Sequence, residues 1–369
     1  MKVLITGANG FVAKNLQVHL SERTDIDVVT FTREQSIDDL SQLLDDVDFI
    51  FHLAGVNRPK NIDEFTQGNA SLTLSLCKAI ESTGRQIPII FSSSIQAELD
   101  NPYGRSKRDA ETSLLEFSQR TGSPVYIFRL PNVFGKWCKP NYNSAVATFC
   151  HNVSHDLPIQ INDPLAIIRL VYVDDVIRRF ESVMDGAVVE EKYCDVAPAY
   201  ELTVGQLAEK LNTFKNSRNL LVVERVGTGL DRALYSTYLS YLEPEQFSYE
   251  LVRYADPRGV FVEMLKTHDS GQFSYFTAHP GVTRGGHYHH SKTEKFLVLK
   301  GDALFKFRHV VTDDYYELSA SGDKPTVVET VPGWSHDITN VGEDEMFVML
   351  WANEIFDPEN PDTYTYTVN

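Results

Sequence analysis

The sequence predicts an α/β domain built on a doubly wound parallel sheet, followed by a second domain that is all β. Up to about residue 240, short apolar runs rich in β-branched residues alternate with helix-like stretches, which is typical of a parallel sheet covered on both faces. From about Tyr254, short strands alternate with turns that contain Gly, Pro and Asp-Asp, as in a sandwich or barrel. The chain has 369 residues, which is more than one hydrophobic core usually serves.

The strands expected in the first part are five apolar runs, at residues 3–6, 28–31, 49–53, 89–91 and 125–128. A helix-compatible stretch, Lys14 to Leu20, follows the first of them. Pro244 and several charged residues place the expected linker at 241–250. We therefore expect one domain over residues 1–243 and the other over 252–369.

Composition narrows the classes of partner. The chain has 34 Lys and Arg against 51 Asp and Glu, a formal net charge of −17, so it lacks the excess of cations that grips a nucleic-acid backbone. Four cysteines lie far apart without any Cys-x-x-Cys pair, as expected for reduced thiols. No apolar run approaches the length of about 18 residues that a membrane-spanning helix needs. We expect a cytoplasmic protein without a nucleic-acid or membrane partner.

A glycine loop joins the first strand to the first helix. Gly7 permits a tight turn, Gly10 lets backbone N–H groups approach a pyrophosphate, and Ala13 fills the third position, where a small residue is needed. This is the pattern of a Rossmann-type dinucleotide site, although a strand-to-helix turn can need glycine for structural reasons alone. The residues expected to contact the cofactor here are Gly7, Asn9, Gly10, Phe11 and Val12.

The end of the second strand indicates which dinucleotide is bound. An NAD-preferring site would place Asp or Glu there, whereas this chain has Thr32 and Arg33. A guanidinium suits a 2′-phosphate, which favours NADP(H). The alternative is that Arg33 is simply a solvated surface residue.

Tyr103 and Lys107 stand four residues apart at the start of a predicted helix, so they share one face about a turn apart. A neighbouring ammonium favours the phenolate and should lower the pKa of Tyr103 toward the working range. Ser94, the last of three consecutive serines, could hold a carbonyl oxygen by a hydrogen bond. Tyr-x-x-x-Lys alone is common and carries little information, but here it follows a strand that ends in serines, which favours an acid–base catalytic group.

Residues 1–240 resemble the extended short-chain dehydrogenase/reductase family, which includes sugar-nucleotide epimerases, dehydratases and reductases. Further matches are the segment Phe51 to Gly55 with Asn69 after it, the turn at 129–135, and the helix start at 173–176. The resemblance implies additional cofactor contacts from His52, Leu53, Ala54, Gly55 and Lys107. Only eight residues separate Ser94 from Tyr103, fewer than the family often has, so Ser92 and Ser93 remain alternatives to Ser94.

The second part contains a pattern of metal-ligating residues. His287 and His289 are two apart on a predicted strand and therefore face the same side, Glu294 follows after a turn, and His336 comes from a distant strand. Three imidazoles and one carboxylate suit zinc, non-haem iron, nickel or manganese. His290 should face the opposite way and is not an expected ligand. The alternative is that these are ordinary surface or hydrogen-bonded histidines.

The same residues resemble the two motifs of the cupin family, with one departure, in that Pro332 and Gly333 adjoin where the family spaces them. The resemblance implies a cupin barrel with His287, His289, Glu294 and His336 as ligands, with Zn²⁺ as the expected ion. A homodimer is also expected, since cupins often pair through their sheets.

A reductase joined to a cupin resembles bifunctional capsule-polysaccharide synthesis enzymes of the CapF type over the whole chain. That resemblance implies a UDP-2-acetamido-2,6-dideoxy-4-ketohexose as substrate. The cupin would epimerise carbon 3, and the first domain would then reduce carbon 4 to give UDP-2-acetamido-2,6-dideoxy-L-talose, a precursor of UDP-N-acetyl-L-fucosamine. Two alternatives stay open: a reductase whose cupin only binds sugar or dimerises, and a regulatory NADP-binding protein without turnover. The sequence leaves open the general base of the epimerisation.

Overall fold

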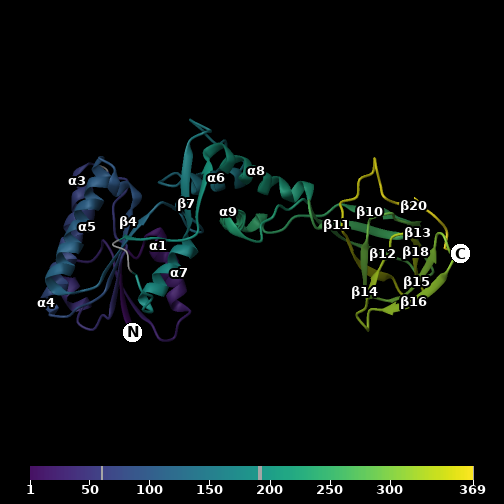
Figure 1. Cartoon of the computed structure of the whole chain (residues 1–369), viewed down its shortest axis with the longest axis horizontal. Helices are drawn as coiled ribbons and strands as arrows, with labels where there is room; N and C mark the ends of the chain where they lie inside the picture. Colours follow the sequence, from purple (N-terminus) through teal and green to yellow (C-terminus); the bar gives the residue numbers. More distant parts are fainter. Residues whose placement is uncertain (60, 190–192, 369) are drawn as a thin grey trace. The chain divides into compact units, whose positions relative to one another are not determined.

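The computed structural model describes residues 1–59, 61–189 and 193–368. The chain forms two compact units, and each is considered by itself (Figure 1). Unit 1 contains Met1–Asn212 and Thr228–Leu242, and unit 2 contains Thr213–Gly227 and Glu243–Asn369.

A parallel sheet of six strands forms the centre of unit 1, in the order β2-β1-β3-β4-β5-β8. The strand order reverses beside β1, and in such sheets ligands bind at the carboxyl ends of the strands near this point. The strands are β1 Lys2–Thr6, β2 Asp27–Phe31, β3 Phe49–His52, β4 Ile89–Ser94, β5 Val125–Leu130 and β8 Tyr193–Cys194.

Helices cover both faces of this sheet (Figure 1). On one face, α4 and α5 contact each other and bury side chains such as Ile80 and Leu114 in a core with Ile50 and Phe91. On the other face, α1 contacts α7, whose Phe180 packs against Phe51 and Phe128. The elements are α1 Phe11–Ser21, α2 Asp39–Leu43, α3 Asp63–Phe65, the π-helical η1 Thr66–Ser71, α4 Leu72–Thr83, the 3-10 helix η2 Ile95–Glu98, α5 Pro102–Thr121 and α7 Val173–Met184.

A second, smaller sheet was not among our expectations. It has the order β6-β7-β9, in which β6 and β7 are parallel and β9 is antiparallel to β7. β6 has only three residues, and neither β7 nor β9 alternates strictly between apolar and polar residues, so the sheet does not stand out in the sequence. The strands of this sheet are β6 Asn132–Phe134, β7 Ile167–Tyr172 and β9 Ala199–Thr203. The remaining helices before residue 250 are α6 Ala145–Ser154, α8 Val204–Leu220, α9 Gly229–Leu239 and the 3-10 helix η3 Pro244–Gln246. The end of α8 and all of η3 belong to unit 2.

From Arg253 onward, unit 2 consists of two antiparallel sheets, in the orders β10-β11-β12-β19-β14-β17 and β16-β15-β18-β13-β20. Apolar side chains from both, among them Phe276, Phe296, Phe305 and Ile338, form one buried core between them. The strands are β10 Arg253–Asp256, β11 Gly259–Thr267, β12 Gly271–Ala278, β13 Thr283–Tyr288, β14 Glu294–Lys300, β15 Asp302–His309, β16 Tyr315–Ser321, β17 Val327–Glu329, β18 Trp334–Asn340, β19 Met346–Ala352 and β20 Tyr364–Thr365. The predicted fold class, a parallel α/β domain followed by an all-β part, is confirmed.

Candidate functional site

The glycine loop is held where β1 ends. Gly7 has φ +70°, and its N–H donates to the Phe31 carbonyl at 2.9 Å. A Cβ on Gly7 would lie 2.6 Å from the Cα of Ala54, so this position accepts only glycine. Gly10 precedes α1, and no side chain of the described residues caps that helix end. The first N–H groups of α1 therefore remain available to an anion such as a pyrophosphate.

The other residues predicted around the loop differ in accessibility. Asn9 and Arg33 are exposed, Arg33 just after the end of β2, and Phe11 and Val12 are half-buried. Ala13 is fully buried, as expected of the small third position where helix packs on strand. All of them lie at the carboxyl edge of the sheet or at the start of α1.

His52 has a different environment from the one expected. Its Nδ1 lies 2.7 Å from the hydroxyl of Thr6 and its Nε2 lies 2.8 Å from the hydroxyl of Thr73, so both ring nitrogens have partners. Burial, with a contribution from Lys107, lowers the pKa of His52 to about 3. The neutral imidazole ties β1, β3 and α4 together, which leaves only backbone groups of His52 for contact with a cofactor.

The segment after β3 passes beside the lysine. Leu53 and Ala54 are half-buried and Gly55 is exposed. A Cβ on Gly55 would lie 3.1 Å from Lys107 Nζ and 3.0 Å from Asn69 Oδ1, so glycine allows this close approach. Asn69 fixes the segment in turn, because its amide bonds to both the N–H and the carbonyl of Val56.

Ser94, Tyr103 and Lys107 come together where β4 ends and α5 begins. Asn101 caps α5 by accepting a hydrogen bond from Gly104 N–H at 2.7 Å, and this sets the first turn that carries Tyr103. The Tyr103 phenol is near enough to Ser94 for the serine hydroxyl to lower its pKa. Lys107 is only 5% exposed, and its ammonium donates to the Ser92 carbonyl at 2.9 Å. A carbonyl substrate beside Ser94 and Tyr103 would find a hydrogen-bond donor and a proton donor.

The electrostatics differ from the expectation for this group. Burial raises the pKa of Tyr103, and the hydrogen bond from Ser94 only partly opposes it. Burial also lowers the pKa of Lys107 to about 8, although Glu111 acts in the opposite direction. The prediction that Lys107 lowers the pKa of Tyr103 does not hold, because burial dominates and Lys107 is not among the groups that act on this phenol.

A buried ion pair behind the serine run was missed in the sequence. The hydroxyl of Ser93 donates to Glu111, which is paired with Arg129 through contacts of 2.6 and 3.0 Å. Ser93 thus faces away from the site, while Ser94, on the other face of the strand, faces Tyr103. Glu111 follows Lys107 by four residues on α5, and this helical spacing was the one signal that could have indicated it.

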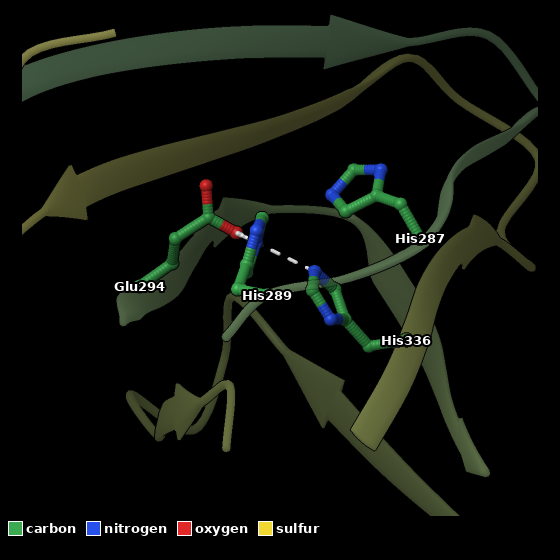
Figure 2. Close-up of side chains that lie close together, drawn as sticks. All are labelled: His287, His289, Glu294 and His336. Atoms are coloured by element: carbon green, nitrogen blue, oxygen red, sulfur yellow. Dashed lines mark hydrogen bonds and ion pairs between the residues drawn. The ribbon is translucent and has the colours of Figure 1, made fainter. Parts of the chain in front are cut away.

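The four predicted metal-ligand residues meet inside unit 2. One potential ligand atom from each of His287, His289, Glu294 and His336 lies within 4.8 Å of the others. Figure 2 shows the four side chains converging from β13, the turn after it, β14 and β18. His290 is exposed and its ring packs on Tyr364, so it lies outside the group.

The donor set suits a divalent cation. Burial would raise the pKa of Glu294, but His289, His336 and Lys292 hold it well below its usual range, so the carboxylate is charged. Burial lowers the pKa of His287 to about 4, which leaves that imidazole neutral, as metal binding requires. Within the described residues His336, 4% exposed, makes no well-aimed hydrogen bond, and its Nε2 lies 3.4 Å from Glu294 Oε2. A buried imidazole without a partner is costly, and a cation would satisfy it.

Comparison with known proteins identifies the family. Residues 3–193 match the model of the NAD dependent epimerase/dehydratase family, and residues 254–364 match that of the polysaccharide biosynthesis C-terminal domain. The chain belongs to the NAD dependent epimerase/dehydratase family. This membership explains why unit 1 has the Rossmann-type fold that binds a nicotinamide dinucleotide.

Two relatives match the whole chain. UDP-2-acetamido-2,6-beta-L-arabino-hexul-4-ose reductase of Pseudomonas aeruginosa is 64% identical over 368 residues, which covers 100% of this chain and 99% of the relative. The crystal structure of the capsular polysaccharide assembling protein CapF from Staphylococcus aureus is 43% identical, superimposes with a TM-score of 0.93 and is covered over 100% of both chains. The predicted resemblance to a CapF-type fusion is confirmed.

A third comparison supports the fold of unit 1 alone. UDP-glucose 4-epimerase of Thermotoga maritima is 20% identical, with a TM-score of 0.57, over 65% of this chain and 98% of that one. As for the membrane, none of the helices in the described residues combines the length and the apolar character needed to span one.

Proposed function

We propose that this chain is a bifunctional nucleotide-sugar enzyme of capsular polysaccharide biosynthesis, in which unit 2 epimerises carbon 3 of a UDP-2-acetamido-2,6-dideoxy-4-ketohexose and unit 1 reduces the 4-ketone with NADPH. The product would be UDP-2-acetamido-2,6-dideoxy-L-talose. Full-length similarity to a hexul-4-ose reductase and to CapF supports this substrate class. The observation that carries the reductase half is the group formed by Ser94, Tyr103 and Lys107 beside the glycine loop.

In the reductase step, Ser94 and Tyr103 bind the ketone oxygen at carbon 4, and Tyr103 donates its proton to that oxygen. When bound, the nicotinamide supplies the hydride that adds to carbon 4. Lys107 lies beside Gly55 and is placed to contact the nicotinamide ribose, as the family resemblance implies. Ketone, NADPH and one proton thus give the alcohol and NADP⁺.

In the epimerisation step, His287, His289, Glu294 and His336 would hold the metal. A bound divalent ion supplies Lewis acidity, which stabilises the enolate formed when carbon 3 loses its proton. The hydrogen at carbon 3 is acidic only while carbon 4 is a ketone, so epimerisation must precede reduction.

Several finer assignments are part of the proposal. Exposed Arg33 after β2 supports NADPH over NADH, and three imidazoles with one carboxylate support Zn²⁺. We also keep the domain limits 1–243 and 252–369, a homodimer, and a cytoplasmic location that fits four free cysteines. The cofactor contacts proposed are Gly7, Asn9, Gly10, Phe11, Val12, Arg33, His52, Leu53, Ala54, Gly55 and Lys107.

Tyr103→Phe tests the reductase assignment. Removal of the phenolic proton donor should lower the rate of NADPH oxidation with the 4-keto sugar by roughly 10²- to 10⁴-fold while the Kd for NADPH stays unchanged. Exchange of the carbon 3 hydrogen in heavy water, followed by NMR without NADPH, should persist in the variant.

Unchanged oxidation would refute the role of Tyr103. Absent exchange in the parent enzyme would mean that unit 2 is a non-catalytic sugar-binding or dimerisation module.

The NADPH titration also tests Arg33. Arg33→Ala should raise the Kd for NADPH about tenfold and leave the Kd for NADH unaffected.

A further inference from the structure

The C-terminal segment lies directly beside β13, the strand that carries the proposed ligand His287 and leads into the turn that carries His289. In β20, Thr365 and Tyr364 pair with His287 and Tyr288 of β13. The next residue, Tyr366, donates its N–H to the Gly286 carbonyl at 2.9 Å. Residues some 75 positions away in the sequence thereby form one wall of the site.

Asp362, just before β20, binds the turn between His289 and Glu294. Its carboxylate accepts hydrogen bonds from three consecutive backbone N–H groups, those of His290, Ser291 and Lys292, at 2.9, 2.7 and 2.8 Å. The Ser291 hydroxyl adds a fourth at 3.0 Å. Successive N–H groups that converge on one anion form a nest, and the anion fixes the conformation of the turn.

The backbone carbonyl of the same residue fixes the tautomer of His289. It lies 2.5 Å from His289 Nδ1, and because a carbonyl can only accept, Nδ1 must carry the proton. In the neutral imidazole that metal binding requires, the lone pair is therefore on Nε2, the nitrogen that lies 3.3 Å from Glu294 Oε2 and faces the other ligands (Figure 2). His289 is 1% exposed, so no water competes for this arrangement.

The turn held by Asp362 also orients the carboxylate ligand. It carries Lys292, which is 8% exposed and contacts Glu294 Oε1 at 3.2 Å. The other oxygen, Oε2, is the one nearest to His289 and His336, at 3.3 and 3.4 Å. Glu294 would therefore offer a single oxygen to a cation, with the second one retained by the ammonium.

We propose that Asp362 is a positioning residue of the metal site, which through its carbonyl sets the tautomer of His289 and through its carboxylate holds the turn that orients Glu294. This inference rests on the proposed metal site. Groups that orient ligands in this way typically affect metal affinity by 10- to 100-fold when they are removed.

Zinc affinity of the full chain tests the proposal. Competition with a chromophoric chelator should show a Kd for Zn²⁺ that is roughly 10- to 100-fold higher in Asp362→Ala than in the parent, and a smaller increase in Asp362→Asn, which keeps one acceptor oxygen. Co²⁺ loaded into both variants should show an altered visible absorption spectrum, which reports the ligand geometry independently of catalysis. Asp357→Ala is the matched control and should bind Zn²⁺ like the parent. Asp357 is an exposed residue of the same segment, and within the described part of the chain its carboxylate accepts only from Glu359 N–H.

Parent-like Kd and spectrum in the Asp362 variants overturn the proposal. If Asp362→Ala does not fold, Asp362→Asn decides in the same way. A parent chain that fails to bind Zn²⁺ or Co²⁺ at one equivalent refutes the metal site itself, a result separate from either outcome above.

Discussion

In unit 1, Tyr103 and Lys107 stand on one turn of one helix, whereas in unit 2 the four proposed metal ligands come from three strands and a turn and depend on a segment at the end of the chain. The reductase groups lie against other protein groups already: Lys107 donates to the Ser92 carbonyl, and Ser94 acts on the pKa of Tyr103. Among the described residues the imidazole of His336 makes no hydrogen bond, and its contact at 3.4 Å is with Glu294, another of the proposed ligands. One site is complete in the protein alone, and the other has donor atoms that a cation would satisfy.

This contrast predicts that the two activities can be removed separately. Lys107→Met should lower the rate of NADPH oxidation by on the order of a hundredfold or more, because a buried hydrogen-bonded ammonium beside the reacting groups is lost. Treatment with a strong chelator should abolish exchange at carbon 3, since the Lewis acid that stabilises the enolate is removed. NMR in heavy water and absorbance at the NADPH band measure the two steps.

Each treatment serves as the control for the other. The Lys107 variant should retain exchange at carbon 3, and the chelated enzyme should still reduce substrate that has already been epimerised. Restoration of exchange by added Zn²⁺ identifies the metal as the cause. Loss of both activities under either treatment contradicts the separation.

The ion pair behind the catalytic serines should affect stability more than any surface pair. Glu111 is 2% exposed and Arg129 is mostly buried. Among the described residues, Glu111→Gln leaves Arg129 with the exposed Glu98 as its one charged partner. Breaking a buried pair on one side costs about 3 kcal/mol in the free energy of unfolding. Urea unfolding followed by the fluorescence of the chain measures it.

Asp100→Ala is the comparison variant, because the pair of Asp100 with Arg105 is formed by side chains that are 84% and 51% exposed. Such pairs contribute about 0 to 1 kcal/mol. Equal losses from Glu111→Gln and Asp100→Ala would mean that the buried network adds nothing beyond an ordinary surface contact.

The sequence predicts more of the site in unit 1 from local spacing than it does of the site in unit 2. Gly7, Tyr103 and Lys107 follow from spacing along a loop and a helix, because local geometry decides which groups meet. The fold class follows for the same reason, from the period of the apolar residues. Glu111, on α5, was missed since its partner Arg129 comes from β5, and no spacing in the sequence joins the two.

Contacts between residues far apart in the sequence also explain the other features that sequence reasoning did not predict. His52 was expected to contact the cofactor, yet its imidazole is taken by Thr6 and Thr73, which only the packing of three elements brings together. The metal ligands were predicted from a family resemblance rather than from periodicity. Asp362, about 70 residues beyond the turn that it binds, carries no sequence signal of its role.

The smallest expected effect concerns pH, and it separates catalysis from stability in unit 1. Burial lowers the pKa of Lys107 to about 8, so the ammonium that donates to Ser92 is lost as the pH rises through that value. The rate of ketone reduction should therefore fall by about twofold at pH 8 and about tenfold for each further unit. Lys107→Arg, which keeps its charge, should lack this decline in the pH profile.

Stability should change in the opposite direction over the same range. The folded pKa of Lys107 lies below the ordinary value of 10.5, so between about pH 8 and 10.5 the unfolded chain binds more protons at this group than the folded chain does. The contribution of Lys107 to the free energy of unfolding thus increases with pH across this window, while the activity falls. Thermal unfolding at pH 7.5, 8.5 and 9.5, compared between the parent and Lys107→Arg, isolates this contribution; a parallel loss of stability and activity in the parent alone would contradict titration of a buried ammonium.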